Sequence, residues 1–311
     1  MKRILILAVA LALTAEGHAQ EGMEAILQQI ARNNKALQAN TQLIASQKLE
    51  SKATNNLANP TLSYSHLWDS DDKNITVGEL VISQSFDFPS LYATRNRVSR
   101  LKSTALDAQS AAVRQQVLLQ AQQLCLDIVL LHQQQQLLDE RLKNAEELAQ
   151  MYAERLKTGD ANALETNKIN LELLNVRTES RTNATTLQNK LKELTALNGN
   201  LPLVPGRPQP EPAMPGPEAL GLTDYTPTPL PADFTPVLNE LLAADPALQA
   251  LQHESAAARK QVSVSKQGWL PQLELGYRRN TETRHPLNGI VVGFSFPLFE
   301  NRHQVKMAKS Q

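Results

Sequence analysis

The sequence has one cysteine, twelve glycines and few aromatic residues, which make up 4% of its 311 positions. Cys125 alone cannot form an intrachain disulfide, and no cysteine and histidine group has zinc-site spacing. The 31 basic residues balance the 31 acidic ones, so no global positive field favours nucleic acid. We therefore expect neither disulfides nor a metal centre, and so little glycine and aromatic content favours long helices over a globular enzyme.

Catalytic signatures are also missing from the sequence. It contains no Gly-x-Ser-x-Gly elbow, no glycine-rich phosphate loop and no His-Glu-x-x-His pair. The histidines are scattered without the spacing of metal ligands. We expect no enzyme activity and no cofactor.

The N-terminus has the features of a secretory signal peptide. Two basic residues precede an apolar run over 4–13, and small residues flank His18. That run is too short for a helix of about 20 residues that would span a membrane. We therefore expect a signal peptide over 1–19, cleaved before Gln20. No later stretch is apolar for about 18 residues, so any membrane crossing after export would use strands.

A heptad pattern predicts a long antiparallel helical hairpin over 92–199, with its tip at 155–165. The apolar seam of its first helix is Val117, Ala121, Leu124, Ile128, Leu131, Gln135, Leu138, Leu142, Ala145, Ala149, Tyr152 and Leu156. The seam of its second helix is Leu173, Val176, Ser180, Ala184, Leu187, Leu191 and Leu194. Gly159 and Gly199 are typical helix stops. A soluble helical bundle fits this segment equally well.

The chain then repeats its first part after a proline-rich segment. Eleven of the 17 prolines lie in 201–236, which we interpret as a stiff, extended linker. Beyond it, Leu37 and Pro60 recur as Leu248 and Pro271, both offset by 211 positions. The first repeat, over 20–200, is expected to contain a helix, a β-hairpin over 60–88 and the long hairpin. The second, over 237–311, is expected to contain a helix, a β-hairpin over 271–297 and the start of a long helix.

The strands alternate between apolar and polar residues at the length that a tilted membrane strand needs. The candidates for lipid contact are Leu62, Tyr64, Leu273, Leu275, Tyr277, Ile290, Val292 and Phe294. The alternation is less regular over 75–88, which predicts a bulge or a short exposed tip. Most aromatic residues flank these strands, as in interfacial girdles. The alternative is a soluble β-hairpin with one buried face.

Four strands cannot close a barrel, because the smallest single-chain membrane barrels have eight. An open edge in lipid would leave backbone groups without hydrogen bonds. Two copies would give eight strands around a filled interior, whereas three would give twelve around an aqueous lumen. The expected fold is mainly α with β: a coiled-coil helical hairpin plus two β-hairpins that contribute four strands to a shared, trimeric 12-stranded barrel.

The duplicated strand starts and strand-to-helix turns, together with the tip sequence over 155–165, resemble the TolC-like outer-membrane efflux channel family. The resemblance covers essentially the whole mature chain. The turns are Phe88-Pro89 and Phe296-Pro297, and the tip has an arginine, a glycine and a following Leu-Glu pair. Within the family, the tip is most similar to the cation-efflux branch.

The resemblance implies a homotrimeric outer-membrane channel of a Gram-negative bacterium that extends into the periplasm. Such a channel is a passive exit duct for small molecules or ions in a tripartite efflux or type I secretion system. It docks to a periplasmic adaptor, or membrane fusion, protein and through it to an inner-membrane pump. Carried over, the adaptor-facing residues are Arg155, Gly159, Leu164 and Glu165. Alternatively, Gly159 only stops one helix and Glu165 only favours the start of the next.

One departure from the family pattern concerns the second repeat. The sequence reaches Gln311 soon after the long helix expected near Asn301. We therefore expect the second helical hairpin to be missing, so no gate residues are assigned, and the chain to be a fragment or a truncated reading frame. A rival function is a soluble periplasmic coiled-coil adaptor or scaffold, which would leave the alternating strands unexplained. The transported substrate does not follow from the sequence.

Overall fold

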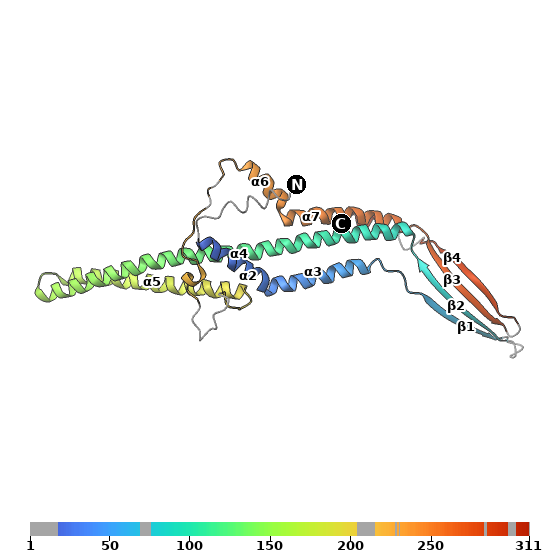
Figure 1. The fold of residues 1–311 in the computed structure, drawn as a ribbon, viewed down its shortest axis with the longest axis horizontal. Helices are drawn as coiled ribbons and strands as arrows, with labels where there is room; N and C mark the ends of the chain where they lie inside the picture. Colours follow the sequence, from blue (N-terminus) through green and yellow to red (C-terminus); the bar gives the residue numbers. More distant parts are fainter. Residues whose placement is uncertain are drawn as a thin grey trace. The chain divides into compact units, whose positions relative to one another are not determined.

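The computed structural model describes residues 18–68, 76–203, 215–227, 229, 231–282, 285–297 and 303–310 (Figure 1). The helices are α2 (His18–Asn33), α3 (Lys35–Ala53), α4 (Pro89–Thr158), α5 (Ala163–Leu197), the short 3-10 helix η1 (Pro217–Leu220), α6 (Thr235–Ala244), α7 (Pro246–Gln267) and α8 (Gln304–Ser310). The strands are β1 (Thr61–Trp68), β2 (Thr76–Phe86), β3 (Gln272–Glu282) and β4 (Leu287–Ser295). Most of the predicted signal peptide lies outside the described residues, and α2 begins at its penultimate position, His18.

The chain forms two compact units. The first consists of Met1–Ala39 and Val113–Asp233, and the second of Asn40–Ala112 and Phe234–Gln311. Helix α4 is continuous through both. Among the described helices, none is both long and apolar enough to cross a membrane.

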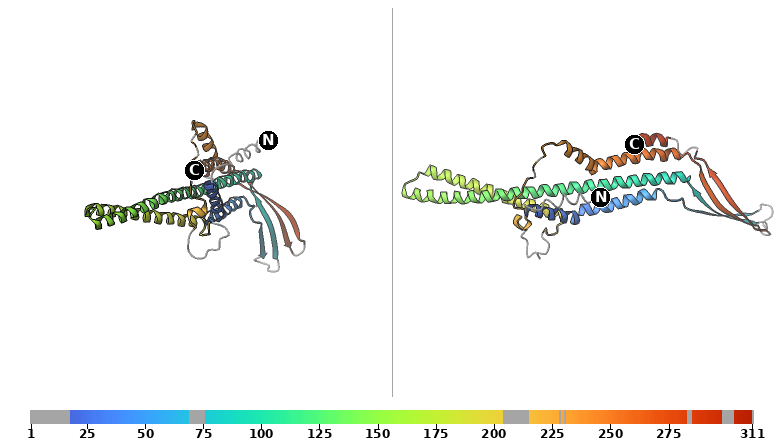
Figure 2. Two further views of the ribbon diagram at one scale, coloured as in Figure 1. Left: turned by 60° about the vertical axis from the view of Figure 1, so that its left-hand side comes forward. Right: turned by 45° about the horizontal axis from the view of Figure 1, so that its top comes forward.

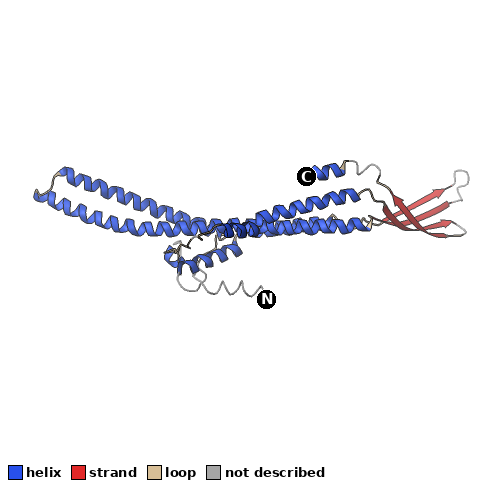
Figure 3. Cartoon of the chain, turned by 90° about the horizontal axis from the view of Figure 1, so that it is seen from above, coloured by secondary structure: helices blue, strands red, loops and turns tan. Residues whose placement is uncertain are grey.

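The first unit is built around the predicted helical hairpin. Helices α4 and α5 run side by side to a common tip (Figure 3). Its core combines apolar residues from three helices and the segment that follows them: Met23, Ile26, Ile30, Ala121, Leu124, Cys125, Ile128, Val129, Leu191, Leu194, Leu203, Leu220 and Leu222. The predicted seam is thus confirmed at Ala121, Leu124, Ile128, Leu191 and Leu194, whereas Leu156, near the tip, is 40% exposed. Helix α2 covers this end of the hairpin with the face that carries Met23, Ile26 and Ile30.

A polar layer interrupts the seam further along the hairpin. Asn183, buried on α5, donates to the Leu131 carbonyl and to Gln135 Oε1, both at 2.9 Å. Gln135 in turn donates to Ser180 Oγ at 2.9 Å. Buried polar groups cost free energy when they lose their partners, so this layer disfavours any slip of one helix along the other.

The proline-rich segment does more than connect the repeats. Residues 204–214 lie outside the described part, but Leu203, Leu220 and Leu222 are buried in the core of the first unit. Helix η1 carries Leu220 into that core, and Gly221 follows it in the left-handed conformation with φ of 69°. The extended linker predicted over 201–236 is therefore wrong over 217–222, because Leu220 and Leu222 there supply apolar anchors.

The buried thiol of Cys125 makes the stability of the first unit sensitive to alkaline pH. Burial raises the pKa of this thiol from its ordinary 9.0 to about 12. Between these values the unfolded chain loses the proton and the folded chain keeps it, so stability falls as pH rises, by at most about 1.4 kcal/mol per pH unit. We expect Cys125→Ala to remove this component of the slope when unfolding free energy is measured against pH. Identical slopes in both proteins would contradict the expectation.

The second unit contains a four-stranded antiparallel sheet in the order β1-β2-β3-β4. Figure 2 shows the strands side by side from two further directions. Strand β2 pairs one-to-one with β1 over 76–83 and with β3 over 77–86, so the bulge predicted within 75–88 is absent from these ladders. The irregular alternation has a simpler cause, since Val77 and Val81 are apolar residues on the otherwise polar face. Residues 69–75, where an exposed tip was the other expectation, lie outside the described part.

Helix α4 begins earlier than the sequence predicts, at Pro89 rather than 92. Proline suits the first turn of a helix, because its missing N–H would have no partner there. The turn before it is held by Asp87, whose carboxylate accepts from Arg95 Nη1 at 2.5 Å and from Gln272 Nε2 at 2.9 Å. The Asp87 N–H also donates to the Tyr92 hydroxyl at 3.0 Å. These contacts fix the angle at which the strand passes into the helix.

Candidate functional site: a two-faced sheet and a helical tip

The strand register gathers all eight candidates for lipid contact on one face of the sheet. Leu62 pairs with Ile82, Ile82 with Tyr277, and Tyr277 with Ile290. Directly paired residues project to the same face, and alternate residues along each strand join them. We call the surface made by Leu62, Tyr64, Leu80, Ile82, Phe86, Leu273, Leu275, Tyr277, Ile290, Val292 and Phe294 the apolar face. Ile290 is 83% exposed, so no described residue of the second unit covers the centre of this face. Contact of this face with lipid stays a prediction.

The opposite face is mainly polar and rich in small residues, although Leu67, Val77, Val81 and Val291 also project from it. It contains Thr61, Ser63, Ser65, Ser83, Ser85, Gly276, Gly289, Gly293 and Ser295. Glu274 lies over Gly293, where an added Cβ would be 3.2 Å from the carboxylate. An ion pair joins Glu79 of β2 to Arg278 of β3. Sequence reasoning missed this pair, because its members meet only through the pairing of strands from different repeats.

Both outer strands of the sheet have a free edge within the described residues. Strand β1 pairs only with β2, and β4 pairs only with β3. Free edges present unpaired N–H and C=O groups that favour pairing with another strand.

The two predicted strand-to-helix prolines are placed differently. Pro89 is the first residue of α4, as described above. Pro297 lies two residues after the end of β4, and the positions that follow it, 298–302, are outside the described part. Helix α8 then begins at Gln304.

Gly159 makes the sharp turn at the hairpin tip. Helix α4 ends at Thr158, and Gly159 adopts the left-handed conformation with φ of 84°. The backbone N–H groups of Asp160 and Ala161 then both donate to the Arg155 carbonyl, at 2.8 and 3.2 Å. This arrangement satisfies a carbonyl that the helix end would otherwise leave free.

Asn162 and Glu165 form a capping box at the start of α5. Asn162 Oδ1 accepts from the Glu165 N–H at 2.8 Å, and Glu165 Oε2 accepts from the Asn162 N–H at 3.5 Å. The helix-start role that the sequence allowed for Glu165 is therefore present. Sequence reasoning overlooked Asn162, although the Asn-x-x-Glu spacing is a known capping signal.

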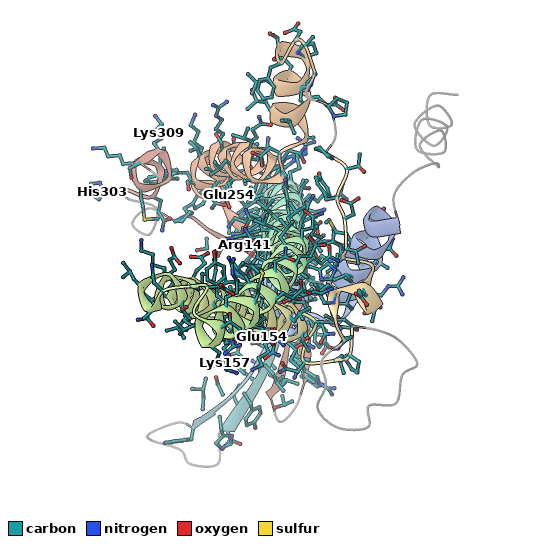
Figure 4. The ribbon with its side chains drawn as sticks, turned by 90° about the vertical axis from the view of Figure 1, so that its left-hand side faces the viewer. Arg141, Glu154, Lys157, Glu254, His303 and Lys309 are labelled. Carbon is teal, nitrogen blue, oxygen red and sulfur yellow. The ribbon has the colours of Figure 1, made fainter. Side chains whose placement is uncertain are left out.

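The remaining tip residues present an apolar side chain beside charged ones. Leu164 is 66% exposed, and the Arg155 guanidinium lies 5.5 Å from the centroid of the Tyr152 ring, within cation–π range. Figure 4 looks at the hairpin from its tip and shows Glu154 and Lys157 on the last turns of α4. The tip thus exposes Leu164 and, at 40%, Leu156, on a segment that also carries charges of both signs.

Replacing Gly159 with alanine should destabilise the tip by about 1–2 kcal/mol, because residues with a Cβ are strained in the left-handed conformation. No atom lies within 4 Å of the position where the Cβ would stand, so the loss would be conformational and not steric. Urea unfolding followed by the helical circular dichroism signal measures it. Gly159→Asn is the matched control and should lose less, since asparagine tolerates this conformation. Equal losses would contradict the explanation.

The described residues contain no group of three or more histidine, cysteine or acidic side chains that could hold a metal ion. No protein-family model and no curated protein matches the sequence.

Solved structures of outer-membrane proteins have the same fold as this chain. Against CusC, whose title describes transmembrane channel formation, the TM-score is 0.70 at 16% identity, over 96% of this chain and 72% of that one. Against the Campylobacter jejuni outer membrane channel CmeC the TM-score is 0.67 at 16% identity, over 93% of this chain and 65% of that one. Against the outer membrane protein VceC of Vibrio cholerae the TM-score is 0.67 at 14% identity, over 93% of this chain and 72% of that one. The chain therefore has the fold of the TolC-like outer-membrane efflux channels, as its sequence predicts.

Proposed function

We propose that three copies of this chain form a passive outer-membrane channel that acts as an exit duct for small molecules or ions. The observation that carries the proposal is the two-faced sheet, with an exposed apolar surface on one side and serine and glycine on the other. Such a sheet suits an environment with lipid on one side and water on the other. In this function the chain performs no chemistry.

The free edges of β1 and β4 support a barrel shared between copies. In lipid each unpaired backbone group costs several kcal/mol, so an isolated four-stranded sheet would be unstable there. Antiparallel pairing of β1 from one copy with β4 from the next removes both edges. Three copies close at twelve strands, with room for water inside.

The hairpin tip is the proposed docking point for a periplasmic adaptor, which would connect the channel to an inner-membrane pump. Glu165 and Gly159 shape the tip, through the capping box and the left-handed turn. Leu164 and Arg155 are the side chains offered to a partner. The proposal places the channel in the outer membrane of a Gram-negative bacterium, with α4 and α5 in the periplasm.

The test is the native mass and conductance of the full chain, expressed with its own N-terminus in a Gram-negative host and extracted from the outer membrane in detergent. A trimer that conducts ions in planar bilayers is the expected result. A monomer found without detergent in the periplasmic fraction would overturn the proposal and favour the scaffold function.

A further inference from the structure

Two consecutive arginines of β3 project from opposite faces of the sheet. Arg278 pairs with Val81 of β2 and lies on the polar face, where it forms the ion pair with Glu79. Arg279 pairs with Leu80 and therefore lies on the apolar face. Its side chain is exposed, and no carboxylate of the described strands forms an ion pair with it. Within the described residues, the apolar face thus carries a cation without an anionic partner.

Arg279 lies at one end of the apolar face and not at its centre. Leu273, near the start of β3, is the first apolar residue of that strand on this face, and Arg279 follows six residues, or about 20 Å, later. On β4 the direct partner of Arg279 is Asn288, and only Leu287 precedes it in the strand. This is the end of the sheet at which β1 leads to β2 and β3 leads to β4, remote from the start of α4.

Two tyrosines mark the boundary at which the apolar face becomes polar. The Tyr277 hydroxyl donates to Asn288 Oδ1 at 2.7 Å, toward the end of the sheet that carries Arg279. The Tyr64 hydroxyl reaches in the same direction, since it would lie 2.8 Å from a Cβ placed on Gly78. Tyrosines with such a polar tip are typical of the boundary between hydrocarbon and water. A charged side chain on a lipid-facing strand costs least at this depth.

Arg279 and Asn288 together offer hydrogen-bond donors at this boundary. They are directly paired across β3 and β4, so their Cβ atoms are about 4.5–5.5 Å apart. Because Asn288 Oδ1 already accepts from Tyr277, the exposed amide has its N–H groups left to donate. The arginine guanidinium presents its N–H groups as a planar fork, which matches two oxygens of a phosphate. The pair therefore suits an anion with several oxygens.

We infer that Arg279 and Asn288 bind a phosphate group of a lipid in the outer leaflet of the membrane. The inference rests on the proposed function in one respect, that the apolar face contacts lipid with this end of the sheet toward the outside of the cell. A lipid is favoured over a soluble phosphate, because the donors adjoin an exposed apolar surface that can take the acyl chains. Arg278 takes no part, since it lies on the other face and is paired with Glu79.

The test is a titration of the full chain, extracted in detergent, with diphosphorylated lipid A, followed by native mass spectrometry. A chelator is present, so that divalent cations do not bridge phosphates to acidic side chains. Arg279→Gln should weaken binding about tenfold, through the loss of charge-assisted hydrogen bonds to one phosphate. Arg279→Lys should weaken it less, since lysine keeps the charge but not the fork.

Arg278→Gln is the matched control, because it removes the same charge one residue away on the opposite face. It should bind the lipid as tightly as the unchanged chain does. Equal weakening by Arg278→Gln and Arg279→Gln, or no weakening by Arg279→Gln, would overturn the inference.

Two further titrations identify the chemistry of the ligand. Lipid A without its phosphates should bind the unchanged chain and Arg279→Gln equally, whereas a tenfold difference there would overturn the phosphate assignment. Inorganic phosphate at the concentration of the lipid should not displace it. Displacement by inorganic phosphate would indicate a site for a soluble anion and overturn the assignment to a lipid.

The same preparations separate this inference from the proposed function. A conducting trimer whose lipid binding is insensitive to Arg279→Gln would leave the channel standing and remove only the lipid site. A monomer found without detergent in the periplasmic fraction would remove both.

Discussion

Replacing Ile290 with arginine is expected to destabilise the chain folded in a lipid bilayer by about 2–4 kcal/mol, the cost of a cationic side chain at the lipid-facing midplane of a membrane strand. Ile290 is paired with Tyr277 near the middle of β4 and is the most exposed large apolar residue described. Buried in lipid, the guanidinium would lose its hydration without a carboxylate to replace it.

Val291→Arg is the matched control, because Val291 is the next residue of β4 and projects from the opposite, polar face. We expect it to cost much less, since an arginine there would project from the polar face, and Glu274 of β3 pairs with Gly293, two residues along β4. Reversible folding into phospholipid vesicles, followed by denaturant titration, measures both variants. Equal costs would count against the assignment of the two faces, and so against the barrel.

Truncating Leu194 to alanine should destabilise the helical hairpin of the first unit by about 2–5 kcal/mol. Leu194 is fully buried in the core shared by α2, α4 and α5. The truncation removes apolar contacts and leaves a cavity that three long helices cannot readily close. The loss is a large fraction of the stability of a typical domain.

Amide hydrogen exchange suits this measurement, because a chain of two units need not unfold in one step. Faster exchange is expected in α2 and in the adjoining parts of α4 and α5, with the sheet unaffected. Leu171→Ala on the same helix is the control, since Leu171 is 61% exposed and its truncation should change exchange little. A similar response to both changes would show that this core does not hold the hairpin together.

Periodicity explains which parts of the structure were predictable. The heptads of α4 place Leu124 and Ile128 in the core, and alternation places Leu275 and Ile290 together on one face. Both inferences need only the geometry of a single helix or strand. The internal repeat added the order of the elements, because Leu37 and Pro60 of the first repeat recur as Leu248 and Pro271 in the second.

Features that depend on distant partners escaped prediction. The polar layer around Asn183 needs the exact alignment of α4 with α5, and the Glu79–Arg278 pair needs the register of β2 on β3. Leu220 was assigned to a linker, because the sequence alone does not show the core in which this residue is buried. In each case the residue type alone does not indicate a special contact. The contact depends on a residue that is distant in sequence and close only in the folded chain.

The order of the sheet has a consequence for how the chain folds. Strands β1 and β2 are neighbours in sequence, but Ile82 of β2 pairs with Tyr277 of β3, about two hundred positions later. During synthesis the first hairpin is therefore left with its apolar side chains uncovered and its β2 edge unpaired until most of the chain has emerged. Such delayed, non-local pairing is slow and exposes an intermediate to aggregation. The need for a holding chaperone is thus greatest after Phe86 has emerged and before Gln272 has.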